Sequence, residues 1–150
     1  MTLANEPMTR KVVVVPPELS LAKAWDVMRR ERFRHLPVVS RGLLVGILSD
    51  RDVLLRARDE GGRVVVPDTP VAEAATPWPY VCGPKTDVCD LVRMMTEKKI
   101  DAVPVLDEAD RLVGLVTSTD LLMLLLPLEQ AKLPLPFIFE LEELSAANVA

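Results

Sequence analysis

The sequence contains one pattern twice, and this internal repeat restricts the possible folds more than any other feature. When Pro37 is aligned with Pro104, "RFRHLPVV" lies over "KIDAVPVL". With one residue inserted in the second copy, "LVGILSDRDVL" lies over "LVGLVTSTDLL", and Gly46 is equivalent to Gly114. The insertion falls in the intervening turn, and turns absorb such changes without altering the strands they join. The chain is therefore two copies of one structural unit.

Each copy predicts the same order of elements, β-α-β-β-α. An extended stretch comes first, "MTRKVVVVPP" or "ATPWPYVCGP", where proline excludes a helix and β-branched residues favour a strand. A helix follows, with Ser20 or Asp87 placed to cap it. Two short strands joined by a turn come next, and a second helix begins at an S/T-x-x-D sequence. The predicted core faces of the first helices are Leu21, Ala24, Trp25 and Met28 in one copy, and Val88, Leu91, Val92 and Met95 in the other.

The length of one copy explains why two are needed. A unit of about 60 residues cannot bury both faces of a three-stranded sheet alone. Two tandem copies can, if their sheets pack together around a pseudo-twofold axis with the helices outside. The predicted fold is therefore α/β (α+β), made of two such repeats. We place the first repeat at 6–60, a linker at 61–73, the second repeat at 74–126 and a C-terminal tail at 127–150.

Composition and charge argue against several classes of function. The net charge of −4 provides no overall basic surface for nucleic acid. No apolar run approaches the roughly 18 residues of a membrane span. The N-terminal "MTLANEPMTRK" lacks the apolar core of a signal peptide, which predicts a cytoplasmic protein. We therefore expect neither a nucleic acid nor a membrane as a partner.

Catalysis and metal binding find little support. The chain has one histidine, His35, and two cysteines, Cys82 and Cys89, whose spacing is not that of a C-x-x-C site. No P-loop or Ser/His/Asp arrangement can be assembled. The cysteines are interpreted as reduced thiols, with a disulfide as the minor alternative. We expect no catalytic residues, no metal ligands and no catalytic cofactor.

The S/T-x-x-D sequence allows two interpretations that do not exclude each other. Ser49 with Asp52, and Thr117 with Asp120, can form a capping box at the start of a helix. The same carboxylate can also accept hydrogen bonds from the two vicinal hydroxyls of a ribose. The exposed amides of the first helical turn favour a phosphate nearby.

These motifs resemble the cystathionine-β-synthase (CBS) domain, and the tandem resembles the paired Bateman module, over roughly residues 6 to 126. The resemblance rests on Met8-Thr9, on the strand starts Leu36-Pro37-Val38 and Val103-Pro104-Val105, and on G-h-h-[ST]-x-x-D, where h is an apolar residue. The second copy has Ala75 where the signature has methionine. The resemblance implies two intertwined repeats, often dimerised into a disc, that bind AMP, ADP or ATP, and sometimes S-adenosylmethionine, in two clefts between the repeats.

The resemblance also implies roles for individual residues. Asp52 and Asp120 would hold the ribose, and Ser49 and Thr117 the ribose or phosphate. Backbone groups next to the two strand prolines would contact the adenine, and the loop threonines would line the clefts. The predicted ligand-binding residues are Thr9, Arg34, His35, Leu36, Pro37, Ser49, Arg51, Asp52, Thr76, Ala102, Val103, Pro104, Thr117, Thr119 and Asp120.

The two copies differ in charge, and this suggests that the sites differ. We assign Arg51, Arg34, His35, Arg10 and Lys11 to the first site, and the equivalent Thr119, Asp101, Ala102, Pro77 and Trp78 to the second. A phosphate would be attracted to the guanidinium groups. The hypothesis is that the Asp52 site binds phosphorylated nucleotide more tightly, while the other is weak, empty or suited to a less charged adenosyl ligand. Alternatively, the arginines of "RRERFR" are a solvated helix face.

The function expected from the sequence is a non-catalytic nucleotide sensor, related to energy sensing, that signals to an effector protein. The alternative is a structural dimerisation or interaction module without a nucleotide ligand. The tail at 127–150 contains "FIFELEEL", an apolar cluster followed by acidic residues. We expect it to make a homodimer contact, because Phe137 and Phe139 would otherwise be exposed, or to dock an effector.

Overall fold

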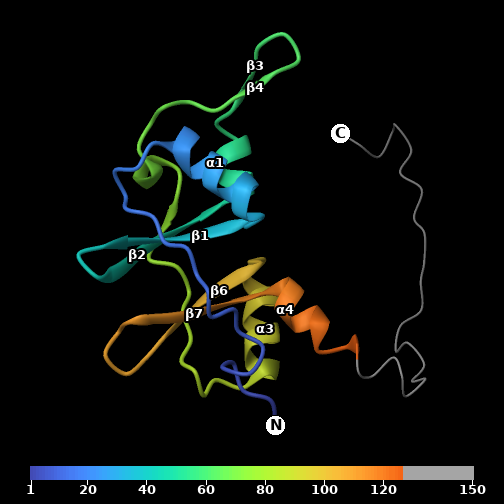
Figure 1. The fold of residues 1–150 in the computed structure, drawn as a ribbon. Helices are drawn as coiled ribbons and strands as arrows, with labels where there is room; N and C mark the ends of the chain where they lie inside the picture. Colours follow the sequence, from blue (N-terminus) through green and yellow to red (C-terminus); the bar gives the residue numbers. More distant parts are fainter. Residues whose placement is uncertain (127–150) are drawn as a thin grey trace, which may run out of the picture.

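The structure is a computed structural model that describes residues 1–126; the predicted tail contact at 127–150 lies outside the described residues. Each repeat has the predicted helix, two strands and second helix (Figure 1). The extended stretch before them, predicted as a strand, forms only isolated bridges at Thr9 and Val15 in the first copy and a two-residue strand in the second. The first repeat contains α1 (Leu21–Glu31), β1 (His35–Ser40), β2 (Leu43–Ser49) and α2 (Asp50–Leu54). The second contains α3 (Val88–Lys98), β6 (Ala102–Leu106), β7 (Leu112–Thr117) and α4 (Ser118–Met123). The two hairpins lie in the middle of the molecule, with α1 and α3 on opposite outer sides. The expected α+β architecture is confirmed.

The helix α1 begins and ends where local signals place it. The Ser20 side chain accepts a hydrogen bond from the Lys23 N–H, and the chain leaves the helix through Arg32 in the left-handed region. In α3 the cap is Asp87, and the left-handed residue is Lys99. The inner face of α1 is the predicted one, with Trp25 half-buried. In α3 the prediction was wrong for Val92, which is 43% exposed, because the buried stripe of this helix is narrower.

The segment between the repeats contains a hairpin that the sequence did not indicate. A short hairpin, β3 (Arg58–Asp59) and β4 (Val64–Val65), turns at Gly61 and Gly62, which both have positive φ. The prolines and glycines of this stretch indicate a linker, and "TPVAEAA" within it predicts a short helical turn opened by Thr69 and Pro70. The 3-10 turn η1 (Val71–Glu73) and the strand β5 (Thr76–Pro77) follow.

Extended segments cross between the two repeats. Thr9 pairs with Leu115 on β7 of the second repeat, through hydrogen bonds of 2.8 and 3.0 Å. Conversely, β5 pairs with β2 of the first repeat, with Pro77 opposite Gly46. Further along, each segment returns to its own repeat, where Val15 pairs with β1 and Cys82 with β6. Figure 1 shows the two crossings as the blue and yellow-green traces that run between the halves. The repeats are therefore intertwined, as the resemblance implied.

The close approach of these segments explains the two equivalent glycines. A Cβ atom on Gly114 would lie 2.6 Å from the Met8 sulfur, and one on Gly46 would lie 3.0 Å from the Thr76 carbonyl oxygen. Both distances are shorter than van der Waals contact, so a side chain at either position would push the crossing segment away from the sheet.

The core consists of two apolar clusters that each draw on both repeats. One gathers Leu21, Leu36 and Leu48 with Val71 and Ala74 from the segment before β5. The other gathers residues of α3, β6 and β7 with Ala4 and Met8 from the N-terminus. Within residues 1–126, no helix is long and apolar enough to cross a bilayer.

Candidate functional site

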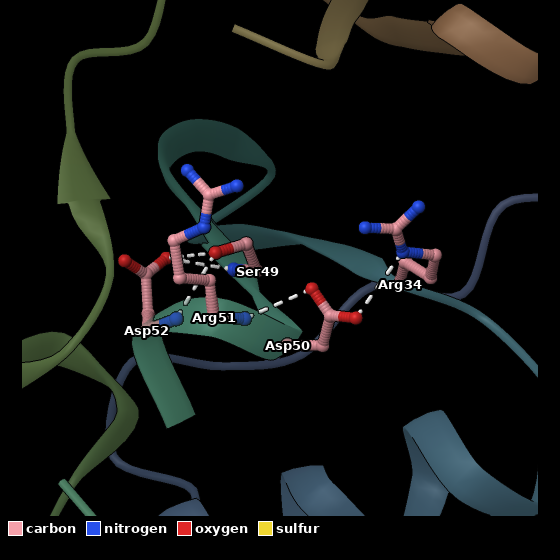
Figure 2. Close-up of polar contacts among 5 residues, drawn as sticks. All are labelled: Arg34, Ser49, Asp50, Arg51 and Asp52. Carbon is pink, nitrogen blue, oxygen red and sulfur yellow. Dashed lines mark hydrogen bonds and ion pairs between the residues drawn. The ribbon is translucent and has the colours of Figure 1, made fainter. Parts of the chain in front are cut away.

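The S/T-x-x-D sequences form capping boxes at the start of α2 and α4, as predicted. In the first, Oδ2 of Asp52 accepts hydrogen bonds from the backbone N–H and the hydroxyl of Ser49, both at 2.8 Å, while the Ser49 hydroxyl accepts from the Asp52 N–H (Figure 2). Thr117 and Asp120 repeat the arrangement, at 2.8 and 2.9 Å. The box fixes each carboxylate through one oxygen and leaves the other oxygen available for a further contact.

The second carboxylate oxygen differs between the two boxes. Oδ1 of Asp120 accepts a hydrogen bond from the Thr9 hydroxyl at 3.2 Å. Within residues 1–126, Oδ1 of Asp52 accepts none. Because a carboxylate is an acceptor only, this oxygen suits a hydroxyl donor such as a sugar diol.

The Asp52 cleft is a cavity of about 320 Å³ between the repeats. The first repeat contributes the capping box and Arg51 from α2. The second contributes Thr76 from β5 and the aromatic residues Trp78 and Tyr80 that follow it. Its other lining residues are Arg34, His35, Ile47, Asp50, Pro79, Lys99, Ile100, Asp101 and Ala102.

The Asp120 cleft is a cavity of about 200 Å³ at the equivalent motif of the second repeat. The second repeat contributes Thr117, Thr119 and Asp120, and the crossing N-terminal segment contributes Thr9 and Lys11. Its other lining residues are Val12, Val13, Arg32, Phe33, Arg34, His35, Asp101, Leu115 and Ser118. Thus each cleft combines the S/T-x-x-D sequence of one repeat with the loop threonine of the other.

The crossing segments overturn the predicted distribution of charge. Lys11 lines the Asp120 cleft and not the Asp52 cleft, while Trp78 lines the Asp52 cleft. Arg10 lines neither, and its guanidinium donates to the Asn5 carbonyl oxygen at 2.9 Å. Since Arg34 lines both cavities, the grouping of cations at the first site was wrong. The physical reason is that residue proximity in sequence was taken for proximity in the fold, whereas the segments exchange sheets.

Most of the other predicted residues line a cleft, but four do not. Leu36, Pro37, Val103 and Pro104 are fully buried within β1 and β6. Sequence reasoning missed Tyr80 and Lys99. The repeat contained a signal for Lys99, because it is equivalent to Arg32 at the left-handed end of α1.

The charged groups beside the Asp52 cleft are only partly paired. Nε of Arg34 lies 3.2 Å from Oδ2 of Asp50, and Oδ1 of Asp50 accepts from the Arg51 N–H at 2.9 Å (Figure 2). The Arg51 guanidinium points away from Asp50, and it forms no ion pair within the described part of the chain. It is therefore available to an anion.

His35 lines both cavities. Burial lowers the pKa of His35, against the opposing influence of the Asp50 and Asp101 carboxylates. The imidazole is therefore neutral at physiological pH. Residues 1–126 contain no group of three His, Cys, Asp or Glu side chains arranged to hold a metal.

Comparison with known proteins identifies the family that this sequence resembles. The sequence profile of the CBS domain matches residues 4–59 and 79–127. The CBS domain-containing protein YhcV of Bacillus subtilis (strain 168) is 31% identical over 121 residues, which are 81% of this chain and 84% of that protein.

Two solved structures have the same fold and hold adenosine-containing ligands. The CBS domain pair of protein MJ0100, in complex with 5′-methylthioadenosine and S-adenosyl-L-methionine, has a TM-score of 0.71 and 25% identity, over 83% of this chain and 95% of that one. The cytosolic domain of the Mg²⁺ channel MgtE, in complex with ATP, has a TM-score of 0.64 and 30% identity, over 78% of this chain and 46% of that one.

Proposed function

The chain belongs to the CBS domain family as a tandem pair, and on this premise we propose that it is a non-catalytic regulatory module that binds adenine nucleotides. The ligand occupies the Asp52 and Asp120 clefts, and its class is AMP, ADP or ATP, with S-adenosylmethionine as a further candidate. Binding changes how the two repeats sit against each other, which an effector protein detects.

The observation that carries this proposal is the geometry of Asp52. Its carboxylate is held by the capping box through Oδ2, lines a cavity, and offers Oδ1 to a donor. Ser49 is tied to the same carboxylate and borders the cavity too. A ribose diol supplies two adjacent hydroxyl donors, which matches a fixed carboxylate acceptor.

The ligands of the two similar structures support adenosine as the recognised group. ATP, 5′-methylthioadenosine and S-adenosylmethionine differ in charge and in the 5′ substituent, but all contain adenosine. The clefts of this chain provide for variation at the 5′ end, because Arg51 borders one and Lys11 the other. We therefore place the base and ribose at the aspartates and the 5′ group at these cations.

Ligand-dependent thermal stability tests the proposal directly. AMP, ADP, ATP, NADH and S-adenosylmethionine at millimolar concentration should be compared, because a ligand that binds only the folded state raises Tm. We expect at least one adenosine ligand to raise Tm, and Asp52→Asn together with Asp120→Asn to remove the effect. Asp90→Asn, on the exposed side of α3, is the matched control for loss of one carboxylate. A flat panel would reject nucleotide binding.

A second candidate, a dimerisation module, is favoured by exposed apolar side chains at the second helix of each repeat. Leu54 and Leu55 lie at the end of α2, and Leu122 and Met123 in α4; their exposed fractions lie between 48% and 76%. Exposed apolar side chains of this size, gathered at one helix end, are typical of an interaction site. We propose that it forms a homodimer contact, compatible with nucleotide binding and with a cytoplasmic location. Sedimentation of Leu122→Glu against the unmodified chain tests it: a monomer is expected where the unmodified chain is a dimer.

A further inference from the structure

Trp78 has a backbone conformation that bulky residues rarely adopt. Its φ is +48°, and the residue is 81% exposed. The other non-glycine residues of 1–126 with positive φ lie at helix ends or hairpin turns: Arg32, Arg41, Lys99 and Asp110. Trp78 instead follows directly after β5 and donates its N–H to the Val45 carbonyl oxygen at 3.2 Å. A strained, exposed tryptophan calls for a functional explanation, because neither burial nor a turn accounts for it.

The surroundings of Trp78 point to a ligand. Trp78 lines the Asp52 cleft, together with the carboxylate assigned to the ribose. The neighbouring Tyr80 ring already has a partner, since Nζ of Lys98 lies 5.4 Å from its centroid. Within the described residues, the Trp78 indole has no cation over its ring. Its flat faces are therefore available to another ring at the mouth of the cleft.

The equivalent position in the first repeat shows that this feature belongs to one cleft only. When Thr9 is placed on Thr76, Lys11 falls on Trp78. Lys11 lines the Asp120 cleft. One cleft thus presents an ammonium group where the other presents an indole, and these two groups suit different parts of a nucleotide.

We propose that Trp78 is a stacking platform for the purine base in the Asp52 cleft, and that this cleft selects its ligand by the base. This inference rests on the proposed function. It adds a residue that contacts the ligand, and it assigns recognition of the base to one cleft and of the phosphate to the other. Aromatic side chains stack on bases over their whole π face. A purine that stacks on Trp78 has its ribose directed to Asp52. In the Asp120 cleft, Lys11 takes the equivalent place and contacts phosphate.

Fluorescence tests the contact. The chain has two tryptophans, and Trp25→Phe leaves Trp78 as the single emitter. Trp25 is half-buried against the core and lines neither cleft, so this variant keeps both sites. Adenosine and AMP are expected to quench Trp78 emission, and ribose 5-phosphate to leave it unchanged. Adding Asp52→Asn should shift the quenching to higher ligand concentration.

A pair of variants separates binding from a structural role. Asparagine tolerates the left-handed region, so Trp78→Asn should leave Tm unchanged or raise it, while calorimetry shows about tenfold or greater loss of AMP affinity at one site. Trp78→Phe keeps an aromatic face and should retain most of the affinity. A tryptophan with only a structural role would give the reverse, a lower Tm and unchanged affinity.

The two levels of the proposal fail in distinguishable ways. If AMP binds and Asp52→Asn weakens it, but Trp78 emission and Trp78→Asn affinity are unchanged, the stacking role is wrong and the proposed function stands. If no adenosine ligand binds the unmodified chain by calorimetry, both are wrong.

Discussion

The hydroxyl of Thr9 donates a hydrogen bond to Asp120 at 3.2 Å, although the two residues belong to different repeats. The contact exists because the N-terminal segment pairs with β7 before it reaches its own repeat. The aspartate of the second capping box is thereby held by both repeats. Both residues line the Asp120 cleft, so a movement of one repeat relative to the other would alter this bond at the wall of the cleft.

Removal of the Thr9 hydroxyl should weaken the junction between the repeats. Thr9→Val keeps the shape of the side chain and loses the hydrogen-bond donor. We therefore expect the free energy of unfolding to fall by about 1 kcal/mol. Chemical denaturation measures this change. Thr76→Val is the matched control, since the equivalent hydroxyl makes no bond to Asp52 within residues 1–126, and it should have a smaller effect. Equal losses for the two variants would contradict the assigned role of the Thr9 bond.

A methyl group on Gly114 should displace the crossing segment. Its Cβ would lie 2.6 Å from the Met8 sulfur and 3.2 Å from the Thr9 carbonyl oxygen, and the backbone oxygen cannot move aside alone. We expect Gly114→Ala to destabilise the fold by about 1–3 kcal/mol, as overpacked cores do. Gly83→Ala is the control, because its nearest neighbour would be 4.0 Å away. Thermal unfolding of both variants measures the difference; equal Tm values would refute the close approach.

Stability should fall on acidification below about pH 6.5 because of His35. Burial lowers its pKa in the folded state, so the unfolded chain binds the proton more readily. The stability that the neutral imidazole contributes is complete above the pKa of the unfolded chain. It is lost as the pH falls from there toward the pKa of the folded chain. The charges that face the imidazole are those of Asp50, Asp101, Asp52 and Arg34. His35→Asn should flatten the pH dependence of the free energy of urea unfolding between pH 7 and the pKa of the folded chain. If the slope of stability against pH is unchanged, the pH dependence arises from the carboxyl groups and not from His35.

The two cysteines should differ in reactivity. Burial raises the pKa of Cys82 to about 11, whereas Cys89 is exposed. The thiolate is the reactive form, so a thiol reagent at pH 8 should modify one cysteine in the folded chain and both after denaturation. Cys89→Ser should abolish the reaction in the folded state. Modification of Cys82 at a similar rate would show that its site opens easily.

Arg51 should recognise charge and not the nucleoside. Its guanidinium is exposed and forms no ion pair within the described residues, so its contribution to phosphate binding is limited to about 1 kcal/mol, or roughly fivefold in affinity. We expect Arg51→Ala to weaken ATP by this factor and to leave adenosine unchanged in calorimetry. Arg29→Ala, on α1 and outside both clefts, controls for net charge. The sequence predicted that the Asp52 site binds phosphorylated ligands more tightly because of five basic residues. Of these, only Arg51 lines the Asp52 cleft and not the Asp120 cleft, so that prediction now depends on Arg51.

The sequence predicted the parts of the fold that depend on local signals. The capping boxes of Ser49 and Thr117 are fixed by residues three positions apart, and the helix periodicity and caps of α1 and α3 are local too. The family resemblance implied intertwined repeats, but it did not show that the segments of Thr9 and Thr76 exchange sheets. The sequence pattern of a strand does not specify which sheet edge the strand joins. Gly46 and Gly114 were the available signal, since a glycine in a strand marks a close backbone approach.

The site was harder to predict for the same reason. Assigning Lys11 to the Asp52 cleft assumed that residues near each other in one repeat stay together, and the crossing reverses this. Trp78 had been placed at the other site, and its positive φ has no sequence signature, because tryptophan is not a residue that favours it.

The exchanged segments also make each half of the chain an incomplete sheet that the other half completes. A cut between Gly61 and Gly62, in the hairpin that joins the halves, would divide the covalent chain without dividing the fold. The two fragments would behave as subunits of a heterodimer, each donating an edge strand to its partner. A single half, produced alone, would present that open edge to any other copy of itself, so the pair is the smallest unit that can close its own hydrogen bonds.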